Sequence, residues 1–518
     1  MNTERFLTTS CSRAAFTGGW RIGTLLPCLL LAATVSPAQD QQPAPSTVTF
    51  TTLVNFDGMN GGNPGVGSAM AQGTDGNIYG ATQGANGNGT FFGLTPGGSL
   101  TESIRTPGVV LGSLVLGTDG NLYGTSGTGG AFGNGEVVKI TPSGVLSTFY
   151  SFCALPNCAD GSYLSEITLG RDGNFYGTTG LGGTGSGCGN PSGCGTAFKL
   201  TPEGTLTTLY NFCSLPSCAD GEAATIIQGI DGNLYGTTNE GGTGGDGAPT
   251  CCGTVFKLTP KGVLTTLYDF CPGGGNCTDG ARPNGPLVQA TNGELYGTAN
   301  SGGANCAGNV GGCGVAFKVT TSGAFTTLYS FCAQPNCTDG AIPDTALVQG
   351  SDGNLYGTTF EGGTGPCFDL VAGCGIIFKM TPGGTVTTLH EFVETDGGAP
   401  NTLLQDTNGS LYGTTFYGGT SSPHCSQGCG TIFRLSAGFK PFVEILPAVG
   451  KVRAAVQILG TNLTGATAVS FNGVAAAFTV VSESEITATV PAGATTGYVT
   501  VTTPKRTLKS NVKFQVRP

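Results

Sequence analysis

Residues 352–358 read Asp-Gly-Asn-Leu-Tyr-Gly-Thr, and this heptapeptide recurs with variation along most of the 518-residue chain. Two further segments accompany most copies: Gly-Thr-Val-Phe-Lys-Leu-Thr at 253–259 and Leu-Thr-Thr-Leu-Tyr-Asn-Phe at 206–212. A repeated word at a period of this size indicates an array of supersecondary units that share one structure. The seven copies lie 44, 53, 59, 61, 60 and 56 residues apart and centre on Tyr79, Tyr123, Tyr176, Tyr235, Tyr296, Tyr356 and Tyr412.

Each unit predicts four short strands separated by turn residues. In one unit these are 346–349, 355–359, 376–381 and 385–392, and the turn at 352–354 is of the Asp-Gly type that favours a tight hairpin. Four antiparallel strands per unit are typical of one β-propeller blade. The 92 glycines and the low charged fraction of 10% fit such a turn-rich all-β protein.

The two ends of the array complement each other. Residues 48–56 are an isolated copy of the fourth strand, whereas the last unit stops after its third strand at 431–435. An N-terminal strand that completes the last blade would close the ring and remove its open edges. The sequence therefore predicts a seven-bladed β-propeller over 48–438, closed by its N-terminal strand.

The repeated sequence pattern resembles that of a known family. The pattern Leu-Tyr-Gly-Thr-Thr, followed by Gly-Gly and Gly-Thr-Val-Phe-Lys-Leu, is similar to the bacterial GloVer tandem repeat over roughly 49–438. That family occurs in secreted proteins with varied C-terminal sorting or accessory modules, of the choice-of-anchor type. The resemblance implies export and repeat architecture, but no particular activity.

Residues 439–518 have a different composition and predict a second domain. Short alternating strands at regular intervals indicate an immunoglobulin-like β-sandwich. The words Gly-Thr-Asn-Leu at 460–463 and Val-Ser-Phe-Asn-Gly at 469–473 resemble an IPT/TIG domain. Lys505 and Arg506 stand where that family usually has a glycine turn.

The N-terminus predicts export. Three arginines precede a short apolar run from Ile22 to Val35, and we interpret 1–38 as a signal peptide followed by a linker at 39–47. A single membrane anchor is the alternative, but Pro27 interrupts the run, which is short for a bilayer span. No later segment is long and apolar enough to cross a membrane. We therefore expect a secreted or cell-surface protein, monomeric, without a transmembrane segment in its mature chain.

The charge is unevenly distributed. Residues 39–439 contain 10 Lys or Arg against 27 Asp or Glu, a balance of −17, while 440–518 contain 8 against 3, a balance of +5. An acidic body without basic stripes argues against a nucleic-acid partner.

The cysteines fall into local pairs at two positions of the repeat. A zinc site would need four ligands together, whereas these pairs belong to different blades, and export favours disulfides. Cys251 and Cys252 are adjacent, and their pairing stays open. The predicted disulfides join Cys153 to Cys158, Cys188 to Cys194, Cys213 to Cys218, Cys271 to Cys277, Cys306 to Cys313, Cys332 to Cys337, Cys367 to Cys374 and Cys425 to Cys429.

Two sets of repeated charges are candidate ligand contacts. An aspartate before glycine follows most fourth strands and would contact a ligand or calcium, or would instead bond its own loop backbone. A repeated cation could form a ring for an acidic glycan, or could pack its stem against the motif tyrosine with its ammonium near a carboxylate. The aspartates are Asp57, Asp160, Asp220, Asp279, Asp339 and Asp396; the cations are Lys139, Lys199, Lys257, Lys318, Lys379 and Arg434.

No catalytic set stands out, and we predict no catalytic residue, metal or cofactor. Only His390 and His424 are present, in different contexts, and one active site needs groups that break the repeat. The main hypothesis is a non-catalytic binding protein whose ligand is an extracellular glycan or protein. A carboxylate-dependent polysaccharide hydrolase or lyase is the alternative, and a purely structural surface protein is the third.

Overall fold

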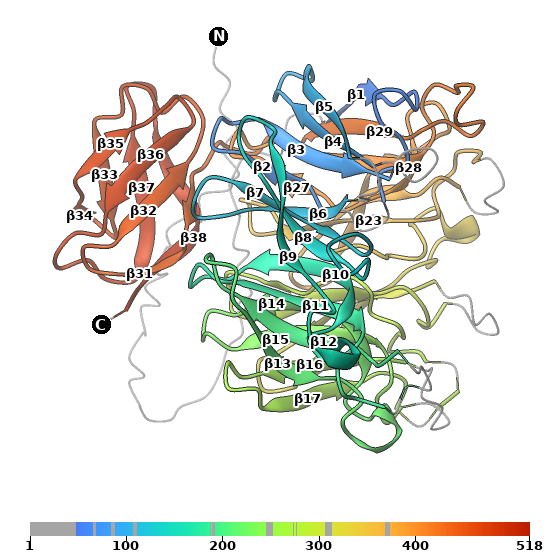
Figure 1. Ribbon diagram of the computed structural model, residues 1–518. Helices are drawn as coiled ribbons and strands as arrows, with labels where there is room; N and C mark the ends of the chain where they lie inside the picture. The colour runs from blue at the N-terminus through green and yellow to red at the C-terminus, as the bar shows by residue number, and fades with distance from the viewer. Residues whose placement is uncertain are drawn as a thin grey trace, which may run out of the picture. The chain divides into compact units, whose positions relative to one another are not determined.

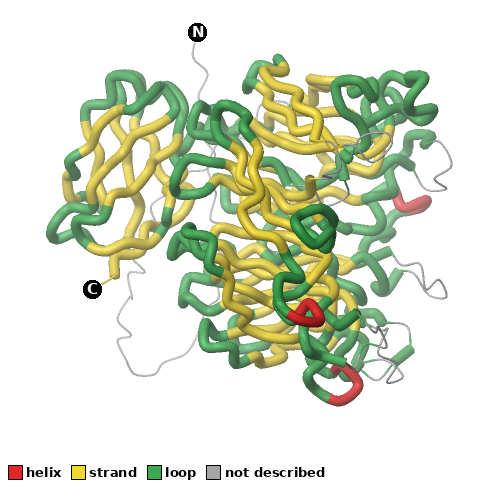
Figure 2. Tube along the Cα trace, viewed as in Figure 1, coloured by secondary structure: helices red, strands yellow, loops and turns green. Residues whose placement is uncertain are grey.

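The structure is a computed structural model that describes residues 48–65, 69–83, 89–106, 111–186, 188, 192–244, 252–272, 274–275, 277–305, 313–367 and 373–517. The predicted signal peptide and linker lie outside this range. Figure 2 shows strands joined by turns and loops, and helix within the described residues is confined to three short 3-10 turns: η1 (Pro156–Cys158), η2 (Pro216–Cys218) and η3 (Pro335–Cys337). None of the described helices has the length and apolar character needed to span a membrane.

The repeat region folds as a β-propeller, as predicted. Its described residues form seven sheets of antiparallel strands, one for each repeat; β14 to β17 lie side by side in Figure 1. We number the blades 1 to 7 in the order of the first strand of each. Blade 1 contains β2 (Ala71–Gln72), β3 (Ile78–Thr82), β4 (Gly89–Leu94) and β5 (Leu100–Thr106); blade 2 contains β6 (Leu111–Leu116), β7 (Leu122–Ser126), β8 (Glu136–Ile140) and β9 (Leu146–Ser151); and blade 3 contains β10 (Ser162–Leu169), β11 (Phe175–Leu181), β12 (Thr196–Leu200) and β13 (Leu206–Asn211). Blade 4 contains β14 (Glu222–Gln228), β15 (Leu234–Glu240), β16 (Thr254–Leu258) and β17 (Leu264–Asp269); blade 5 contains β18 (Val288–Gln289), β19 (Leu295–Ala299), β20 (Val315–Val319) and β21 (Phe325–Ser330); and blade 6 contains β22 (Val348–Gln349), β23 (Leu355–Thr359), β24 (Ile376–Met380) and β25 (Val386–Glu391). Blade 7 contains β26 (Gly398–Pro400), β27 (Leu404–Gln405), β28 (Leu411–Tyr417) and β29 (Thr431–Ser436), together with β1 (Thr49–Asn55).

The motif residues explain why each blade adopts this fold. In blade 4 the turn between β14 and β15 places Gly232 at φ 82°, which a side chain would disfavour. Tyr235 and Phe256 are then fully buried, and a Cβ on Gly236 would lie 2.6 Å from the Phe256 ring. The glycine of Tyr-Gly-Thr is therefore needed so that the third-strand phenylalanine can cross the second strand closely.

The ring closes through the first strand. β1 pairs antiparallel with β29, from Thr49 opposite Ser436 to Asn55 opposite Thr431, although the two strands lie at opposite ends of the repeat region (Figure 1). This pairing covers the edge that the last repeat would otherwise expose. The predicted closure by the N-terminal strand is confirmed.

A glutamine at the end of the innermost strand links neighbouring blades. Its side-chain Oε1 accepts the backbone N–H of a turn residue in the preceding blade, and the bond to Gln72 joins blade 7 to blade 1. Leu116 and Leu169 replace this glutamine in blades 2 and 3. The five bonds run from Asp172 to Gln228 at 3.3 Å, Ile230 to Gln289 at 2.7 Å, Thr291 to Gln349 at 2.9 Å, Ser351 to Gln405 at 3.0 Å and Thr407 to Gln72 at 3.1 Å.

The C-terminal residues form a separate two-sheet β-sandwich, as predicted. The inner faces share one core that contains Val456, Ile486, Val499 and Phe514. The segment 503–506, which contains Lys505 and Arg506, forms the turn between β37 and β38, closed by a bond from the Thr503 N–H to the Arg506 carbonyl oxygen. One sheet contains β30 (Glu444–Leu446), β32 (Ala455–Leu459), β36 (Glu485–Thr489) and β35 (Phe478–Val480); the other contains β31 (Val449–Lys451), β38 (Thr507–Arg517), β37 (Gly497–Thr502), β33 (Ala468–Phe471) and β34 (Val474–Ala475).

Candidate functional site

The long loops of every blade lie at the same end of their sheets. Because the strands alternate in direction, the loop between the second and third strands and the loop between blades share one end, and the short turns share the other. Direct bonds join the two long loops: the Gly183 N–H donates to the Cys158 carbonyl oxygen, and the Gly242 N–H donates to that of Cys218, both at 2.9 Å. We call this end of the propeller the loop face; it contains every cysteine among the described residues of the repeat region.

The repeated aspartates of the loop face bond their own loops. Asp220 is fully buried, and its carboxylate accepts the Tyr210 hydroxyl at 2.7 Å and the N–H groups of Ser214 and Leu215 at 2.8 and 3.1 Å. Burial and the adjacent Asp220 raise the pKa of Tyr210, which keeps its phenol protonated as a donor. Asp160 and Asp339 repeat this set of bonds with Tyr150 and Tyr329.

Three other aspartates of this set vary the arrangement. Asp279 accepts Tyr268 and the N–H of Cys271, while Asp396 accepts the N–H of Val393 and pairs with His390 Nε2 at 3.0 Å. Asp57 is exposed and accepts two backbone N–H groups of its own turn, which lower its pKa, the Asn60 bond most. The geometry favours a structural role for these carboxylates; their direct contact with a ligand remains a prediction.

Seven of the predicted disulfides are present on the loop face. They join Cys153 to Cys158, Cys188 to Cys194, Cys213 to Cys218, Cys271 to Cys277, Cys332 to Cys337, Cys367 to Cys374 and Cys425 to Cys429. Cys252 and Cys313 are also disulfide-bonded. Cys251 and Cys306 lie outside the described residues, so the bond from Cys306 to Cys313 stays a prediction and the pairing of Cys251 stays open.

The cysteines also come together in a way that the sequence did not predict. The Sγ atoms of Cys188, Cys194 and Cys213 and a carboxylate oxygen of Glu222 lie within 4.8 Å of one another. These are ligand types that zinc accepts, but each of the three sulfurs is already in a disulfide. The cluster therefore offers no thiolate to a metal in this state.

Four of the repeated cations pair with carboxylates at the other end of the blades. Lys139 Nζ lies 2.8 Å from Asp119 and 5.7 Å from the centre of the Tyr123 ring, and Lys257 similarly approaches Asp231 and Tyr235. Lys318 and Lys379 pair with Glu294 and Asp352. The ring-packing interpretation is thus supported where these contacts are found, and the ammonium groups face carboxylates of their own blade.

Glu222 and Glu240 form a pair of acids that the sequence reasoning missed. They are cross-strand partners in β14 and β15, and burial together with the hydrogen bond that protonated Glu222 donates to Glu240 raises the pKa of Glu222 to about 7. The repeat offered a signal, since Ser162, Ala281 and Ala341 occupy the position of Glu222 in other blades. Carboxyl groups in direct contact are closer than the roughly 5–9.5 Å separation that glycoside hydrolases use.

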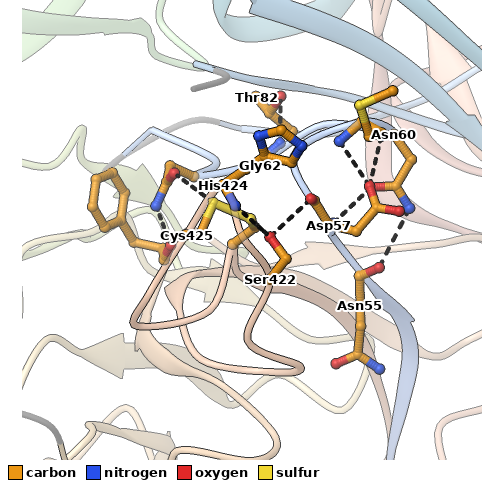
Figure 3. The surroundings of a disulfide bond; sticks show 12 residues. Asn55, Asp57, Asn60, Gly62, Thr82, Ser422, His424 and Cys425 are labelled. Atoms are coloured by element: carbon orange, nitrogen blue, oxygen red, sulfur yellow. Dashed lines mark hydrogen bonds between the residues drawn. A yellow bond between two sulfur atoms is a disulfide. The ribbon is translucent and has the colours of Figure 1, made fainter. Parts of the chain in front are cut away.

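A serine, a histidine and an aspartate also gather where the ring closes (Figure 3). Ser422 Oγ donates to the backbone oxygen of Asp57 at 2.9 Å and accepts the backbone N–H of His424 at 3.2 Å. The Asp57 carboxylate is held by its own turn, beside Asn60. These backbone bonds build the loop that Cys425 and Cys429 close, and they do not form a Ser–His–Asp relay.

Comparisons with known proteins support the same architecture. The family model described as Gloeobacter/Verrucomicrobia repeat matches residues 42–190, 186–369 and 307–451, and the IPT/TIG domain model matches 442–516. No match was found among curated proteins.

Solved structures give distant similarities only. The extracellular domain assigned to a hybrid two-component system, BT3049 of B. thetaiotaomicron, is 10% identical, with a TM-score of 0.46 over 92% of this chain and 58% of that one. PorZ of Porphyromonas gingivalis, a surface component of the type-IX secretion system, is 14% identical, with a TM-score of 0.44 over 90% of this chain and 61% of its own.

Proposed function

Because the chain belongs to the Gloeobacter/Verrucomicrobia repeat family and ends in an IPT/TIG domain, we propose that it is a non-catalytic binding protein of the bacterial surface or extracellular space. One observation supports this above the others: the long loops gather on one end of the propeller and are pinned by disulfides. Rigid scaffolds that present several loops on one face are a common basis for recognition.

The proposal includes export. Residues 1–38 would be a cleaved signal peptide and 39–47 a linker, followed by the propeller over 48–438 and the IPT/TIG-like domain over 439–518 as a spacer or docking module. Local disulfides in this number are typical of an oxidising compartment outside the cytoplasm. The protein would act as a monomer whose partner is an extracellular glycan or protein.

Arrays of glycans and of extracellular proteins test the proposal with the full chain. We expect specific retention on at least one array, without turnover of the retained ligand. Hydrolysis or elimination of an arrayed polysaccharide would instead establish the enzyme alternative. Two empty arrays, together with unchanged behaviour after mutation of the Asp-Gly loops, would favour a purely structural protein.

A further inference from the structure

Five blades carry a non-glycine residue with a left-handed backbone at the same position of the loop face. L-residues rarely adopt this conformation, and bulky or β-branched side chains do so least. The position lies where the loop between blades enters each blade: Tyr163 is in β10 and Ala399 in β26, and the other three residues precede the innermost strand of their blade. We call these the rim residues: Asn63 (φ 49°), Tyr163 (φ 56°), Arg282 (φ 55°), Ile342 (φ 57°) and Ala399 (φ 51°).

The preceding blade holds each rim residue in place. The rim N–H donates to a backbone oxygen of the loop before the third strand of that blade, over 2.7 to 3.0 Å. In four of the five cases the acceptor belongs to a disulfide-bonded cysteine. The bonds run from Asn63 to Cys429, Tyr163 to Asn134, Arg282 to Cys252, Ile342 to Cys313 and Ala399 to Cys374.

The rim backbone is constant, but its side chains are not. The five residues carry an amide, a phenol, a guanidinium, a branched alkyl group and a methyl group; Tyr163 and Arg282 are exposed, and Ala399 is buried. Elsewhere the repeat keeps its side chains, as in the seven motif tyrosines that pack between blades. A strained backbone that is held identically while its side chains vary is the arrangement expected at a recognition surface.

Tyr163 is an exposed aromatic residue of the rim. Its side chain is 58% exposed, and its ring lies over Gly127 of blade 2 and Gly180 of blade 3. A Cβ on either glycine would lie 3.5 or 3.6 Å from the nearest ring atom. The ring thus rests against a flat floor without side chains and keeps much of its surface open, with a hydroxyl at its tip.

Polar side chains continue around the rim across blades 4 to 6. Asn239 Nδ2 donates to Asn284 Oδ1 at 3.3 Å, and Asn284 and Asn300 both donate to Asp344 Oδ1, at 3.0 and 2.9 Å. Burial raises the pKa of Asp344. Arg282, two residues before Asn284, is exposed and makes no ion pair with any residue in the described ranges.

We propose that the rim binds an oligosaccharide, with Tyr163 as the stacking platform and Arg282 and Asn284 as donors to sugar hydroxyl groups. A sugar ring has an apolar face that suits an open aromatic ring and a hydroxyl-bearing edge that suits amide and guanidinium donors. A protein partner would need a larger apolar centre than Tyr163 and Ile342 provide. This inference rests on the proposed binding function and names its ligand class and site.

Affinity electrophoresis of the full chain through native gels tests the rim with soluble xylan, mixed-linkage β-glucan, galactomannan, pectin and alginate as probes. We expect at least one of them to retard the wild-type chain. Tyr163→Asn should weaken the affinity obtained from that retardation about tenfold or more, since loss of a central aromatic contact typically has this effect. Asparagine tolerates the left-handed backbone and stands at the same position in blade 1, so this variant should fold.

Two matched variants separate ring stacking from folding. Tyr163→Phe keeps the ring and should retain most of the binding, and Val263→Asn, at an exposed short turn of blade 4, should leave it unchanged. Equal retardation of Tyr163→Asn and wild type would overturn the rim assignment while the binding function stands. If none of the polysaccharides retards the wild-type chain but the protein array retains it, the saccharide ligand is refuted while the binding function stands. Two empty arrays would overturn both proposals.

Discussion

In the loop between β13 and β14, the carboxylate of Asp220 accepts three hydrogen bonds from groups that would otherwise bond to water. It accepts one phenol and two backbone N–H groups while it is fully buried. A buried donor that loses its acceptor bears its whole desolvation cost, which exceeds the net gain from an ordinary hydrogen bond. The single aspartate of each such loop therefore determines whether the loop keeps its conformation.

Asp220→Ala should lower the free energy of unfolding by about 2–4 kcal/mol, because one phenol and two backbone N–H groups lose the buried acceptor that fixes the loop. Guanidinium denaturation followed by circular dichroism measures this change. Glu203→Ala, at an exposed short turn, is the control and should change stability by less than about 0.5 kcal/mol. Equal stability of the two variants would contradict the structural role of Asp220.

Glu222 makes stability depend on pH in the direction opposite to a salt-bridged acid. Its pKa rises from 4.5 in the unfolded chain to about 7 in the fold, first through burial and then through the bond that protonated Glu222 donates to Glu240. Between these values the folded state keeps a proton that the unfolded state has lost, so the free energy of unfolding falls as pH rises from about 4.5 to 7.

Glu222→Gln should remove this slope, since the amide resembles the protonated acid and cannot ionise. The variant should be about 1 kcal/mol more stable than wild type at pH 8, a value reduced for solvent screening of a partly exposed pair, and equal to it at pH 4. Melting temperatures at the two pH values measure the difference. A wild-type stability that rises between pH 4.5 and 7, with no change of slope in the variant, would refute the assignment.

At the scale of elements, the blades depend on contacts that only their neighbours provide. The innermost strands of blades 5 and 6 have only two residues, Val288–Gln289 and Val348–Gln349, whereas the sequence predicts four at 346–349. Such short strands gain little from their own ladder. The glutamine bonds therefore contribute a larger share of the hydrogen bonding between these blades and their neighbours.

Gln349→Leu should lower the free energy of unfolding by about 1–2 kcal/mol, because the Thr291 N–H and the Gly353 carbonyl oxygen both lose a partner. The repeat supplies the replacement, since leucine occupies this position in blades 2 and 3. Chemical denaturation measures the change, and hydrogen exchange at Thr291 localises it. Unaltered protection of Thr291 in the variant would show that the bond does not connect the blades.

At the scale of the whole molecule, closure depends on seven residues that are remote from their partner strand. β1 supplies the outer strand of blade 7, where Phe50 stacks on His390 with ring centres 3.6 Å apart and packs against Phe392 and Phe433. His390 stands where other blades have tyrosine, and the same stacking joins Tyr268 to Phe325 within the array. The closing contact is thus a copy of an internal contact.

A chain that begins at residue 57 should therefore lose the ring, although it keeps every complete repeat. We expect its melting temperature to fall by on the order of 10 °C, with aggregation through the exposed β29 edge. A chain that begins at residue 45 retains β1 and is the control. Calorimetry and size-exclusion chromatography compare the two, and identical melting of both would disprove closure by β1.

The sequence by itself determined the repeat, the strand pattern, the closing strand, the IPT/TIG-like sandwich and the local cysteine pairs. Each of these follows from residues close together in the chain. An Asp-Gly turn favours a hairpin, the alternation of apolar and polar residues indicates the buried face of a strand, and cysteines about five residues apart favour a local disulfide. The motif lysines were predictable for the same reason, since each cation lies on the strand beside its tyrosine.

Tertiary structure alone decided which side chains share the loop face. Glu222 and Glu240 become partners only when β14 and β15 pair. A rim residue is identified by its left-handed φ angle and by the bond from its N–H to the preceding blade. Asp220 looks like a ligand contact in the repeat, but packing buries it against Tyr210. Local patterns determine the elements, whereas the desolvation of each side chain depends on neighbours from other blades, which the sequence does not place.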